Sequence, residues 1–199
     1  MASGFGAVVL AGGRARRMGG VDKPLLPVGE RSMLDRVLDA CRHNAPRVVV
    51  GAVPGTPPDV RVTREEPPGG GPVAALAAGL ALLDDDTTTV AVLAADLPFL
   101  DPEAVAALHA ALTEGGRDGV VFVDENGRRQ LLCGAWRVAP LRAAVAARAA
   151  SGLAGASMRG LVAGLSVAEE RWSRSGPPPW FDCDTQEDLE RAEEWARRR

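Results

Sequence analysis

The sequence contains no tyrosine, and its 199 residues include three cysteines and two histidines. Cys41, Cys133 and Cys183 are far apart and form no CxxC spacing. An odd number of isolated cysteines is not typical of a disulfide framework or of a cysteine-ligated metal site. We therefore expect three reduced, partly buried thiols in a cytoplasmic protein. His43 and His109 both fall in segments of helical pattern and have no partners in a Ser-His-Asp arrangement.

Long apolar runs and a charged amino-terminal region are also missing. No run approaches the ~18–20 apolar residues that span a bilayer, and the first residues do not have the pattern of a secretory signal. The net charge of −3 excludes a broadly basic surface, so neither a membrane nor a nucleic acid is an expected partner. Hydrophobic residues at 46% and charged residues at 25% are typical of a folded protein. We expect a single domain over residues 1–199.

Lysine is nearly absent as well. Lys23 is the only lysine among 23 basic residues. Every other residue in this count of basic residues is an arginine, so arginine is the usual surface cation of this chain. The lone lysine is therefore a candidate functional residue.

Apolar, β-branched runs alternate with segments of helical periodicity along the chain, which predicts βαβ units. Strands are expected at 6–10, 47–50, 60–63, 90–95, 119–123, 131–136, 165–168 and 180–183, and helices at 32–44, 72–83, 102–113, 140–150, 157–163 and 186–195. The expected helix N-caps are Ser32, Asp101 and Thr185. Asn126-Gly127 is a strong hairpin signal, so strand 131–136 should be antiparallel. The predicted fold is a three-layer α/β/α Rossmann-like sandwich, mostly parallel with one antiparallel strand.

Ligands of such sheets bind beyond the carboxyl ends of the strands. That rule selects the glycines after the first strand, Asp96 after the fourth, and residues 182–184 at the end of the last predicted strand. These three places are the candidate site.

Residues 10–23 (LAGGRARRMGGVDK) have the composition of a polyanion cradle. The paired glycines let backbone N–H groups approach a phosphate. Arg14, Arg16, Arg17 and Lys23 add positive charge suited to phosphate oxygens. The segment is not a Walker A loop, because Pro24 follows the lysine where Ser or Thr is required. It is not a GxGxxG fingerprint either, so a P-loop kinase or ATPase is disfavoured.

The same segment, LAGG-x-x-x-R-M-G-G-x-D-K, resembles the signature of nucleotidyltransferases of the molybdenum cofactor guanylyltransferase (MobA-like) family. The resemblance continues along nearly the whole chain. It includes GPVAAL at 71–76, AADLPFL at 94–100 and DCDTQEDL at 182–189.

The resemblance implies roles for individual residues. Arg17 and Lys23 would hold the triphosphate and neutralise the leaving pyrophosphate. Glu65 or Glu66 would contact the base, and of the two we select Glu66. An acidic residue fits this role, because a carboxylate can accept from the N1–H and N2–H₂ groups of guanine. The complete implied nucleotide-binding set is Leu10, Ala11, Gly12, Gly13, Lys23, Glu66, Gly71 and Asp96.

The resemblance also implies a Mg²⁺ cofactor. Asp96 would bind the metal, and an acid fixed at a strand end suits an ion that takes one or two carboxylates plus phosphate oxygens and water. Asp184 occupies the place of a second ligand. Asp182 lies two residues away on the same face of the predicted strand, so it stays an alternative to Asp184.

The implied reaction is transfer of GMP from GTP to molybdopterin carrying molybdenum, with release of pyrophosphate. Other cofactor-biosynthesis proteins or a molybdoenzyme chaperone are further candidate partners. Two departures leave the base open: Gly51 stands where some relatives carry Asn, and Asp182-Cys183-Asp184-Thr185 replaces Asn-x-Asn-Thr. The Asp-x-Asp form is common in related cytidylyltransferases.

Two alternatives therefore remain. One is the same chemistry with CTP or with another small phosphorylated acceptor. The other is a nucleotide-binding regulator without turnover, against which the joint presence of Lys23, Arg17, Asp96 and Asp184 counts. Arginines in the carboxyl-terminal half could hold the acceptor phosphate, and the candidates are Arg128, Arg129, Arg137 and Arg159.

Overall fold

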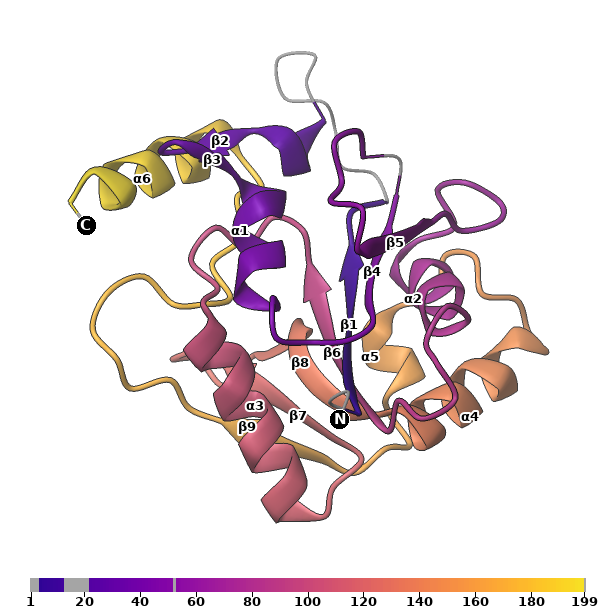
Figure 1. The fold of residues 1–199 in the computed structure, drawn as a ribbon. Helices are drawn as coiled ribbons and strands as arrows, with labels where there is room; N and C mark the ends of the chain where they lie inside the picture. The colour runs from indigo at the N-terminus through magenta and orange to yellow at the C-terminus, as the bar shows by residue number, and fades with distance from the viewer. Residues whose placement is uncertain (1–3, 13–21, 52, 199) are drawn as a thin grey trace.

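The computed structural model describes residues 4–12, 22–51 and 53–198 (Figure 1). The strands are β1 (Phe5–Leu10), β2 (Pro27–Val28), β3 (Arg31–Ser32), β4 (Arg47–Val50), β5 (Val60–Thr63), β6 (Thr89–Ala94), β7 (Gly119–Val123), β8 (Arg129–Arg137) and β9 (Val167–Glu170). The helices are η1 (Lys23–Leu25), α1 (Met33–Ala40), α2 (Pro72–Leu80), α3 (Pro102–Gly115), α4 (Val138–Ala149), α5 (Met158–Leu161) and α6 (Gln186–Arg197).

The central sheet has seven strands in the order β5-β4-β1-β6-β8-β7-β9. Only β8 runs against its neighbours, pairing antiparallel with both β6 and β7. The other neighbouring pairs are parallel. The predicted mostly parallel sheet with one antiparallel strand is confirmed.

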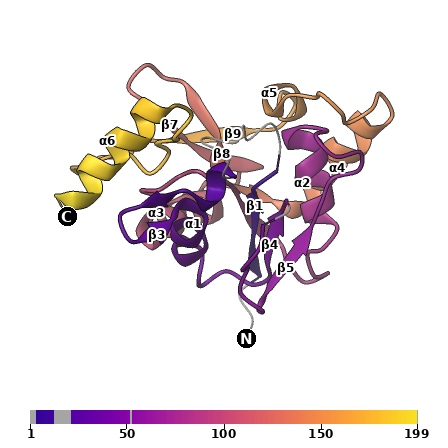
Figure 2. The same ribbon diagram turned by 90° about the horizontal axis from the view of Figure 1, so that it is seen from above.

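Helices cover both faces of this sheet. In Figure 2, α1 and α3 lie on one side of the strands, and α2 and α4 lie on the other. The first face is filled by residues such as Val9, Leu93 and Leu108, and the second by residues such as Val8, Leu76 and Trp136. Successive residues of β1 thus point to opposite layers, and a strand buried on both faces explains the continuous apolar runs in the sequence.

The β7–β8 hairpin rises above the carboxyl edge of the sheet. Asp124 holds the turn, because its Oδ1 accepts hydrogen bonds from the N–H groups of Asn126 and Arg128, both at 2.9 Å. Gly127 adopts φ +74°. Leu93, near the end of β6, faces Cys133 of β8. The residues before Cys133 therefore project past the end of β6.

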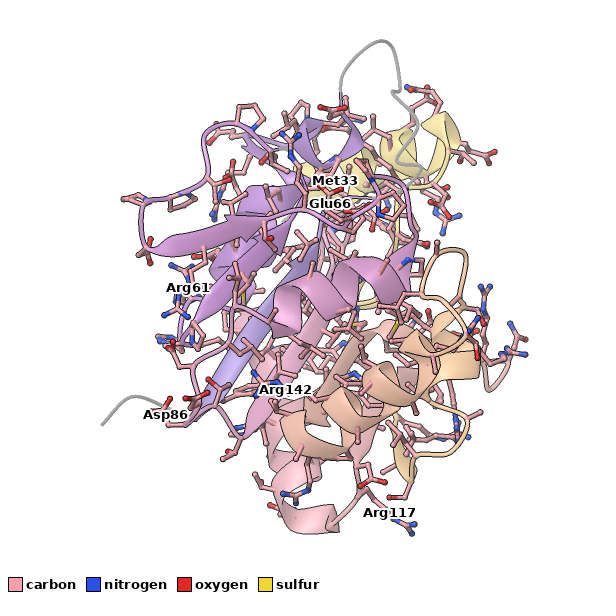
Figure 3. The ribbon with its side chains drawn as sticks, turned by 90° about the vertical axis from the view of Figure 1, so that its right-hand side faces the viewer. Met33, Arg61, Glu66, Asp86, Arg117 and Arg142 are labelled. Atoms are coloured by element: carbon pink, nitrogen blue, oxygen red, sulfur yellow. The ribbon has the colours of Figure 1, made fainter. Side chains whose placement is uncertain are left out.

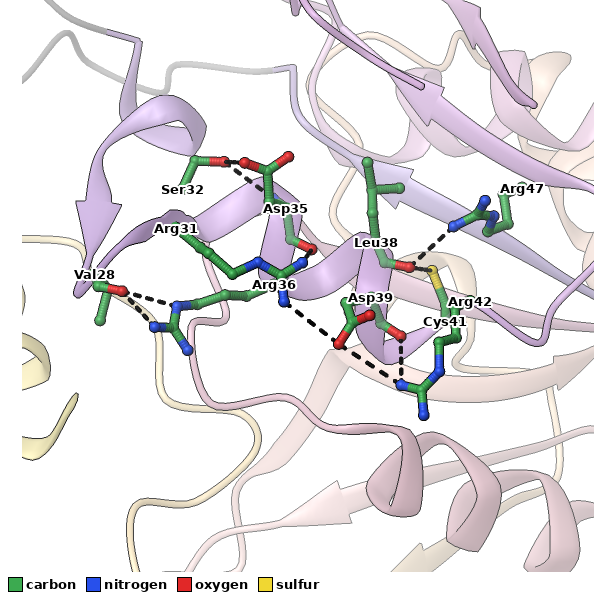
Figure 4. A network of polar contacts seen from close by, with 10 residues as sticks. All are labelled: Val28, Arg31, Ser32, Asp35, Arg36, Leu38, Asp39, Cys41, Arg42 and Arg47. Atoms are coloured by element: carbon green, nitrogen blue, oxygen red, sulfur yellow. Dashed lines mark hydrogen bonds and ion pairs between the residues drawn. The ribbon is translucent and has the colours of Figure 1, made fainter. Parts of the chain in front are cut away.

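A smaller third core ties the amino-terminal third of the chain to α6. Val28, Met33, Phe99, Phe181, Cys183 and Ala192 form it. Gly29 N–H donates to Glu193 at 2.8 Å, and Arg36 of α1 donates from Nε and Nη2 to the Val28 carbonyl at 2.9 and 2.5 Å (Figure 4). The chain that follows Lys23 is thereby fixed against both α1 and α6.

The predicted helix N-caps are confirmed. The side chains of Ser32, Asp101 and Thr185 accept from backbone N–H groups at 3.1, 2.8 and 3.1 Å. Thr185 and Asp188 form a complete capping box. The three cysteines are free, and they are buried more completely than the sequence predicted. No helix within the described ranges is long and apolar enough to cross a membrane.

Residues 180–183 do not form the predicted strand. Pro177–Pro179 remove three backbone donors in succession, and Phe181 N–H then turns back to the Pro178 carbonyl at 3.0 Å. Phe181 and Cys183 are buried while Asp182 and Asp184 are exposed. This alternation imitates a strand, but the segment packs onto the third core without joining a ladder.

Two smaller differences concern short elements. The strand predicted at 165–168 is found at Val167–Glu170, on the edge of the sheet beside β7. The β2–β3 hairpin was not predicted, because each of its strands has only two residues, too few to show an alternating pattern.

Candidate active site

One cavity of about 760 Å³ opens at the carboxyl edge of the sheet. It brings together segments that lie far apart in the chain. Its lining includes Leu10, Ala11, Gly12, Lys23, Gly71, Asp96, Arg128, Arg129, Gln130, Leu131, Arg159, Trp180, Asp182 and Asp184.

Lys23 lies at the centre of this site as a buried cation, with a residue exposure of 6%. Its Nζ is 2.6 Å from Oδ2 of Asp96 and 2.5 Å from Oδ1 of Asp184. Burial by itself lowers the pKa of Lys23, but the two carboxylates outweigh it and hold the pKa above the ordinary value. The ammonium is therefore charged and bridges two acids.

Backbone contacts position Asp96 between the first strand and the carboxyl-terminal segment. Ala95 N–H donates to the Leu10 carbonyl at 3.1 Å, which joins the ends of β6 and β1. Cys183 N–H approaches the Asp96 carbonyl at 3.4 Å. These contacts bring residues 182–184 beside Asp96, although this segment is not the strand that the sequence predicted.

The two aspartates of the carboxyl-terminal segment differ in charge behaviour. The hydrogen bond from Lys23 lowers the pKa of Asp184 below its ordinary value. Desolvation, followed by the nearby charges of Asp184 and Asp96, raises the pKa of Asp182 to about 6. Asp184 is thus the acid directly paired with Lys23, and Asp182 is the acid that adds negative charge beside the pair.

The carboxylates of Asp96 and Asp184 suit a divalent cation. The ammonium of Lys23 stands within hydrogen-bond distance of an oxygen from each, so a cation already fits between them. Mg²⁺ is typically held by one or two carboxylates and completes its octahedron with phosphate oxygens and water. In the described ranges no group of three or more His, Cys, Asp or Glu side chains is placed to hold a metal ion, at this cavity or away from it, so the candidate protein ligands are the pair Asp96 and Asp184.

The loop after β5 places its two glutamates differently. Glu65 is 4% exposed and accepts from Gly69 N–H at 3.1 Å. A Cβ built on Gly12 would stand 3.1 Å from its Oε2, so this carboxylate lies against the loop that follows β1. Glu66 is exposed, and Figure 3 shows it well away from Asp86 at the other end of β1. Glu66 is not among the cavity-lining residues of the described chain.

Gly51 lies tightly against the same loop. Its φ is +148°, and a Cβ there would stand 2.8 Å from the Ala11 carbonyl carbon and 2.9 Å from Gly12 N. A side chain at position 51 would displace the backbone that lines the cavity.

The structure thus gathers most of the predicted site residues at one cavity. They are Leu10, Ala11, Gly12, Lys23, Gly71, Asp96 and Asp184, with the alternative Asp182 beside them. Gly13 and Arg17 lie outside the described residues.

The arginines considered from the sequence divide into three kinds. Arg137 points away from the site, because it donates to the carbonyls of Arg117 and Leu112. Arg129 lines the cavity and pairs with Glu169 at 2.8 Å. Arg128 and Arg159 line the cavity with exposed side chains.

Trp180 is a cavity residue that the sequence did not indicate. Its position two residues before Asp182 could have indicated that it lies near the site. The sequence pattern instead predicts it as the first residue of a strand.

Similar proteins are found by family model, by whole sequence and by solved structure. A family model described as MobA-like NTP transferase domain matches residues 7–172. Molybdenum cofactor guanylyltransferase of Rhodopseudomonas palustris (strain BisB5) is 32% identical over 203 residues, covering 96% of this chain and 94% of that protein.

Two solved structures share the fold. Molybdopterin-guanine dinucleotide biosynthesis protein A from Archaeoglobus fulgidus has a TM-score of 0.72 at 19% identity, covering 97% of this chain and 99% of that one. The 2-C-methyl-D-erythritol 4-phosphate cytidylyltransferase of Thermus thermophilus has a TM-score of 0.70 at 24% identity, covering 96% and 98%. The chain belongs to the MobA-like NTP transferase domain family and is a nucleotidyltransferase.

Proposed function

We propose that the protein transfers GMP from GTP to the phosphate of molybdopterin and releases pyrophosphate. The observation that carries the proposal is the bridge of the buried Lys23 between Asp96 and Asp184, three residues that line the cavity at the carboxyl edge of the sheet. The similarity over nearly the full chain to a protein named molybdenum cofactor guanylyltransferase supports this donor and this acceptor.

The step is an in-line substitution at phosphorus. An oxygen of the acceptor phosphate forms a bond to the α-phosphorus of GTP, and the bond from that phosphorus to the bridging oxygen of the β-phosphate breaks. The leaving group is pyrophosphate. The attacking phosphate is already ionised near pH 7, so no general base is required. The main obstacle is repulsion between two anions and charge build-up at the transferred group.

Lys23 is suited to reduce that charge. When the triphosphate enters, its oxygens compete with Asp96 and Asp184 for the ammonium. The backbone N–H of Gly12 is proposed as a further donor, whereas Ala11 N–H already donates to the Val50 carbonyl at 2.8 Å. Arg17 is proposed to add a second cation on the pyrophosphate side.

Mg²⁺ is the proposed cofactor, and Asp96 with Asp184 would hold it. When bound there it would supply Lewis-acid stabilisation of the phosphate oxygens. Asp96 is fixed by β6 and Asp184 by the third core, so both carboxylates are preorganised. Asp182 lies close enough to Asp96 and Asp184 for its carboxylate to interact with theirs electrostatically.

The base is the least constrained part of the proposal. Guanine presents two donors to a carboxylate, whereas cytosine presents one amino donor beside acceptors. Glu66 is the residue that the sequence selects for this role, and the buried Glu65, against Gly12, is the neighbouring candidate. We expect the wild type to prefer GTP over CTP about tenfold or more in kcat/KM. Substitution of the glutamate that contacts the base should reduce this preference.

A cytidylyltransferase is the second candidate. Asp182-Cys183-Asp184 and the absence of a side chain at Gly51 favour it.

The deciding experiment measures pyrophosphate release with molybdopterin and either GTP or CTP, in the wild type and in the Glu65→Gln and Glu66→Gln variants. Faster turnover of GTP supports the proposal. Faster turnover of CTP assigns the protein to cytidylyl transfer, and nucleotide binding without pyrophosphate release assigns it to a regulatory role.

A further inference from the structure

One wall of the cavity is formed by the glycine-rich turn that precedes α2. Gly69 and Gly71 of this turn line the cavity, with φ values of +77° and +89°. Apart from chain neighbours, a Cβ built on Gly69 would meet no atom of the described residues within 4 Å, and one on Gly71 would meet Gly155 N at 3.9 Å. The turn therefore presents bare backbone with open space beside it, which suits the close approach of a flat ring.

The short helix α5 is attached to this turn. Gly155 N–H donates to the Gly70 carbonyl at 2.8 Å. Met158 and Leu161 of α5 are buried in the same core as Leu76 of α2, and the two helices lie side by side in Figure 2. The backbone of α5 is thus fixed relative to the turn before α2.

Arg159 is the cation that this arrangement places beside the turn. Ser157 caps α5 by accepting from Gly160 N–H at 3.1 Å. Arg159 follows in the first turn of the helix, where its side chain is exposed and lines the cavity. It forms no ion pair with a carboxylate in the described part of the chain, whereas Arg129 of the cavity lining pairs with Glu169. The guanidinium of Arg159 is therefore available to a ligand.

Lys23 and Arg159 belong to opposite layers of the fold. The chain after Lys23 is fixed against α1 and α6, whereas α5 packs with α2, and α1 and α2 cover opposite faces of the sheet (Figure 2). A nucleotide with its triphosphate at Lys23 crosses the edge of the sheet at Gly12 and brings its base to the turn before α2. Glu65 lies at the same end, because its carboxylate accepts from Gly69 N–H at 3.1 Å and lies against Gly12.

We propose that Arg159 reads the base of the donor nucleotide, and that its guanidinium donates two hydrogen bonds to O6 and N7 of guanine. These two acceptors are neighbours on one edge of the purine, and the fork of an arginine matches their spacing. A glutamate of the loop after β5 accepts from N1–H and N2–H₂ on the other edge. This inference rests on the proposed function, because it takes the triphosphate to lie at Lys23 and the base to be guanine.

The main competing arrangement is a contact of Arg159 with a phosphate group of either substrate. The two arrangements differ in their dependence on the base, because a phosphate contact is the same for every base. A nucleotide analogue that lacks one of the two acceptors on guanine distinguishes them.

The first test compares GTP with 7-deaza-GTP, in which a C–H group replaces N7. The wild type should have a KM for 7-deaza-GTP about tenfold above that for GTP, because one N–H donor of Arg159 loses its acceptor. In Arg159→Ala the KM for GTP should rise about tenfold, and the two nucleotides should become equivalent within about twofold. An equal rise for both nucleotides in Arg159→Ala would overturn the proposal, as would a wild type that does not distinguish them.

The second test separates the shape of the side chain from its charge. Arg159→Lys keeps the charge and removes the two-pronged donor, so its KM for GTP should stay within about threefold of that of Arg159→Ala. A phosphate would accept the ammonium instead, and recovery of most of the affinity in Arg159→Lys would overturn the proposal.

Two controls accompany these variants. Arg148→Ala removes a half-buried arginine of α4 outside the cavity lining and should leave the KM for GTP unchanged. The KM for the acceptor, varied separately, should stay within about twofold of wild type in Arg159→Ala. A selective rise in the acceptor KM would assign Arg159 to the acceptor and overturn the proposal.

A binding measurement without acceptor separates this inference from the proposed function. Isothermal titration calorimetry compares GTP with 7-deaza-GTP on the wild type and on Arg159→Ala. A preference for GTP that disappears in Arg159→Ala, in a protein that releases no pyrophosphate with molybdopterin, would refute the proposed function and leave the inference standing. Guanylyl transfer by a protein whose affinity for both nucleotides is indifferent to Arg159 would do the reverse.

Discussion

Lys23 and Asp184 are 161 residues apart in the chain, yet their side chains are joined by a 2.5 Å hydrogen bond. Asp96 completes the contact from the centre of the sheet. The cation and the two acids come from three elements that local sequence patterns do not connect. Their meeting is the main reason to treat this edge of the sheet as the reacting centre.

Replacing Lys23 by Ala should reduce kcat/KM for the nucleotide about 10²-fold or more, since one preorganised charge at a developing charge is worth ~3 kcal/mol. Steady-state pyrophosphate release measures the effect, and circular dichroism checks that the fold is kept. Turnover within about twofold of wild type would exclude a role for this ammonium at the triphosphate.

The same lysine should compete with a metal ion in the nucleotide-free protein. Lys23→Met removes the ammonium from the oxygens of Asp96 and Asp184, so Mg²⁺ should bind more tightly to the variant than to the wild type. Isothermal titration calorimetry measures this, and the Lys23→Met, Asp96→Asn double variant is the control that should lose the gain. Unchanged Mg²⁺ affinity would mean that the metal binds elsewhere.

Asp96→Asn and Asp184→Asn should each weaken Mg²⁺-dependent activity, with Asp96→Asn the more severe because β6 fixes that carboxylate. The amide keeps the shape of the side chain and removes its charge. The measurement is the activity at increasing Mg²⁺ concentrations, with Asp182→Asn as the matched comparison. If Asp182→Asn alone abolishes activity, the metal ligand is Asp182 and not Asp184.

A side chain at position 51 should disturb the nucleotide site and not improve its selectivity. Gly51→Asn introduces a Cβ within 2.8 Å of Ala11 and a strained φ that costs on the order of 1–3 kcal/mol. We expect lower stability in urea unfolding and weaker binding of both GTP and CTP. Gly116→Ala, at φ +62° with open space around it, controls for strain without a clash. Sharper selectivity for GTP in Gly51→Asn, at unchanged stability, would contradict the prediction.

His109 should make stability depend on pH. Desolvation lowers its pKa below 6.5, and its ring stacks on Phe5 at 3.8 Å. The unfolded chain therefore takes up a proton at a higher pH than the folded one. The contribution of His109 to stability should fall as the pH decreases from 6.5 to the lower pKa of the folded state, while Asp182, whose pKa is raised to about 6, contributes with the opposite sign. Urea unfolding at several pH values tests this; His109→Gln should flatten the dependence in that window, and His43→Gln should not.

Features of the fold that depend on neighbouring residues could be predicted from the sequence, whereas contacts between distant residues could not. Short-range signals were reliable: the run Gly119–Val123 and the turn at Asn126-Gly127 predicted β7 and the reversal of β8. The alternation at 180–183 was misleading, because burial against α6 repeats with the same period as burial in a sheet. The ion bridge at Lys23 and the exposure of Trp180 to the cavity depend on long-range packing, which one sequence does not reveal.

The docking of α6 has a consequence for the order in which the site is completed during synthesis. Every strand of the seven-stranded sheet lies before Arg171, whereas Asp184 belongs to the segment fixed by α6 and the third core. A nascent chain that has reached β9 can form the sheet but still lacks one of the two acids that bracket Lys23. The cluster of Lys23, Asp96 and Asp184 is therefore complete only after α6 has been synthesised and has packed into place.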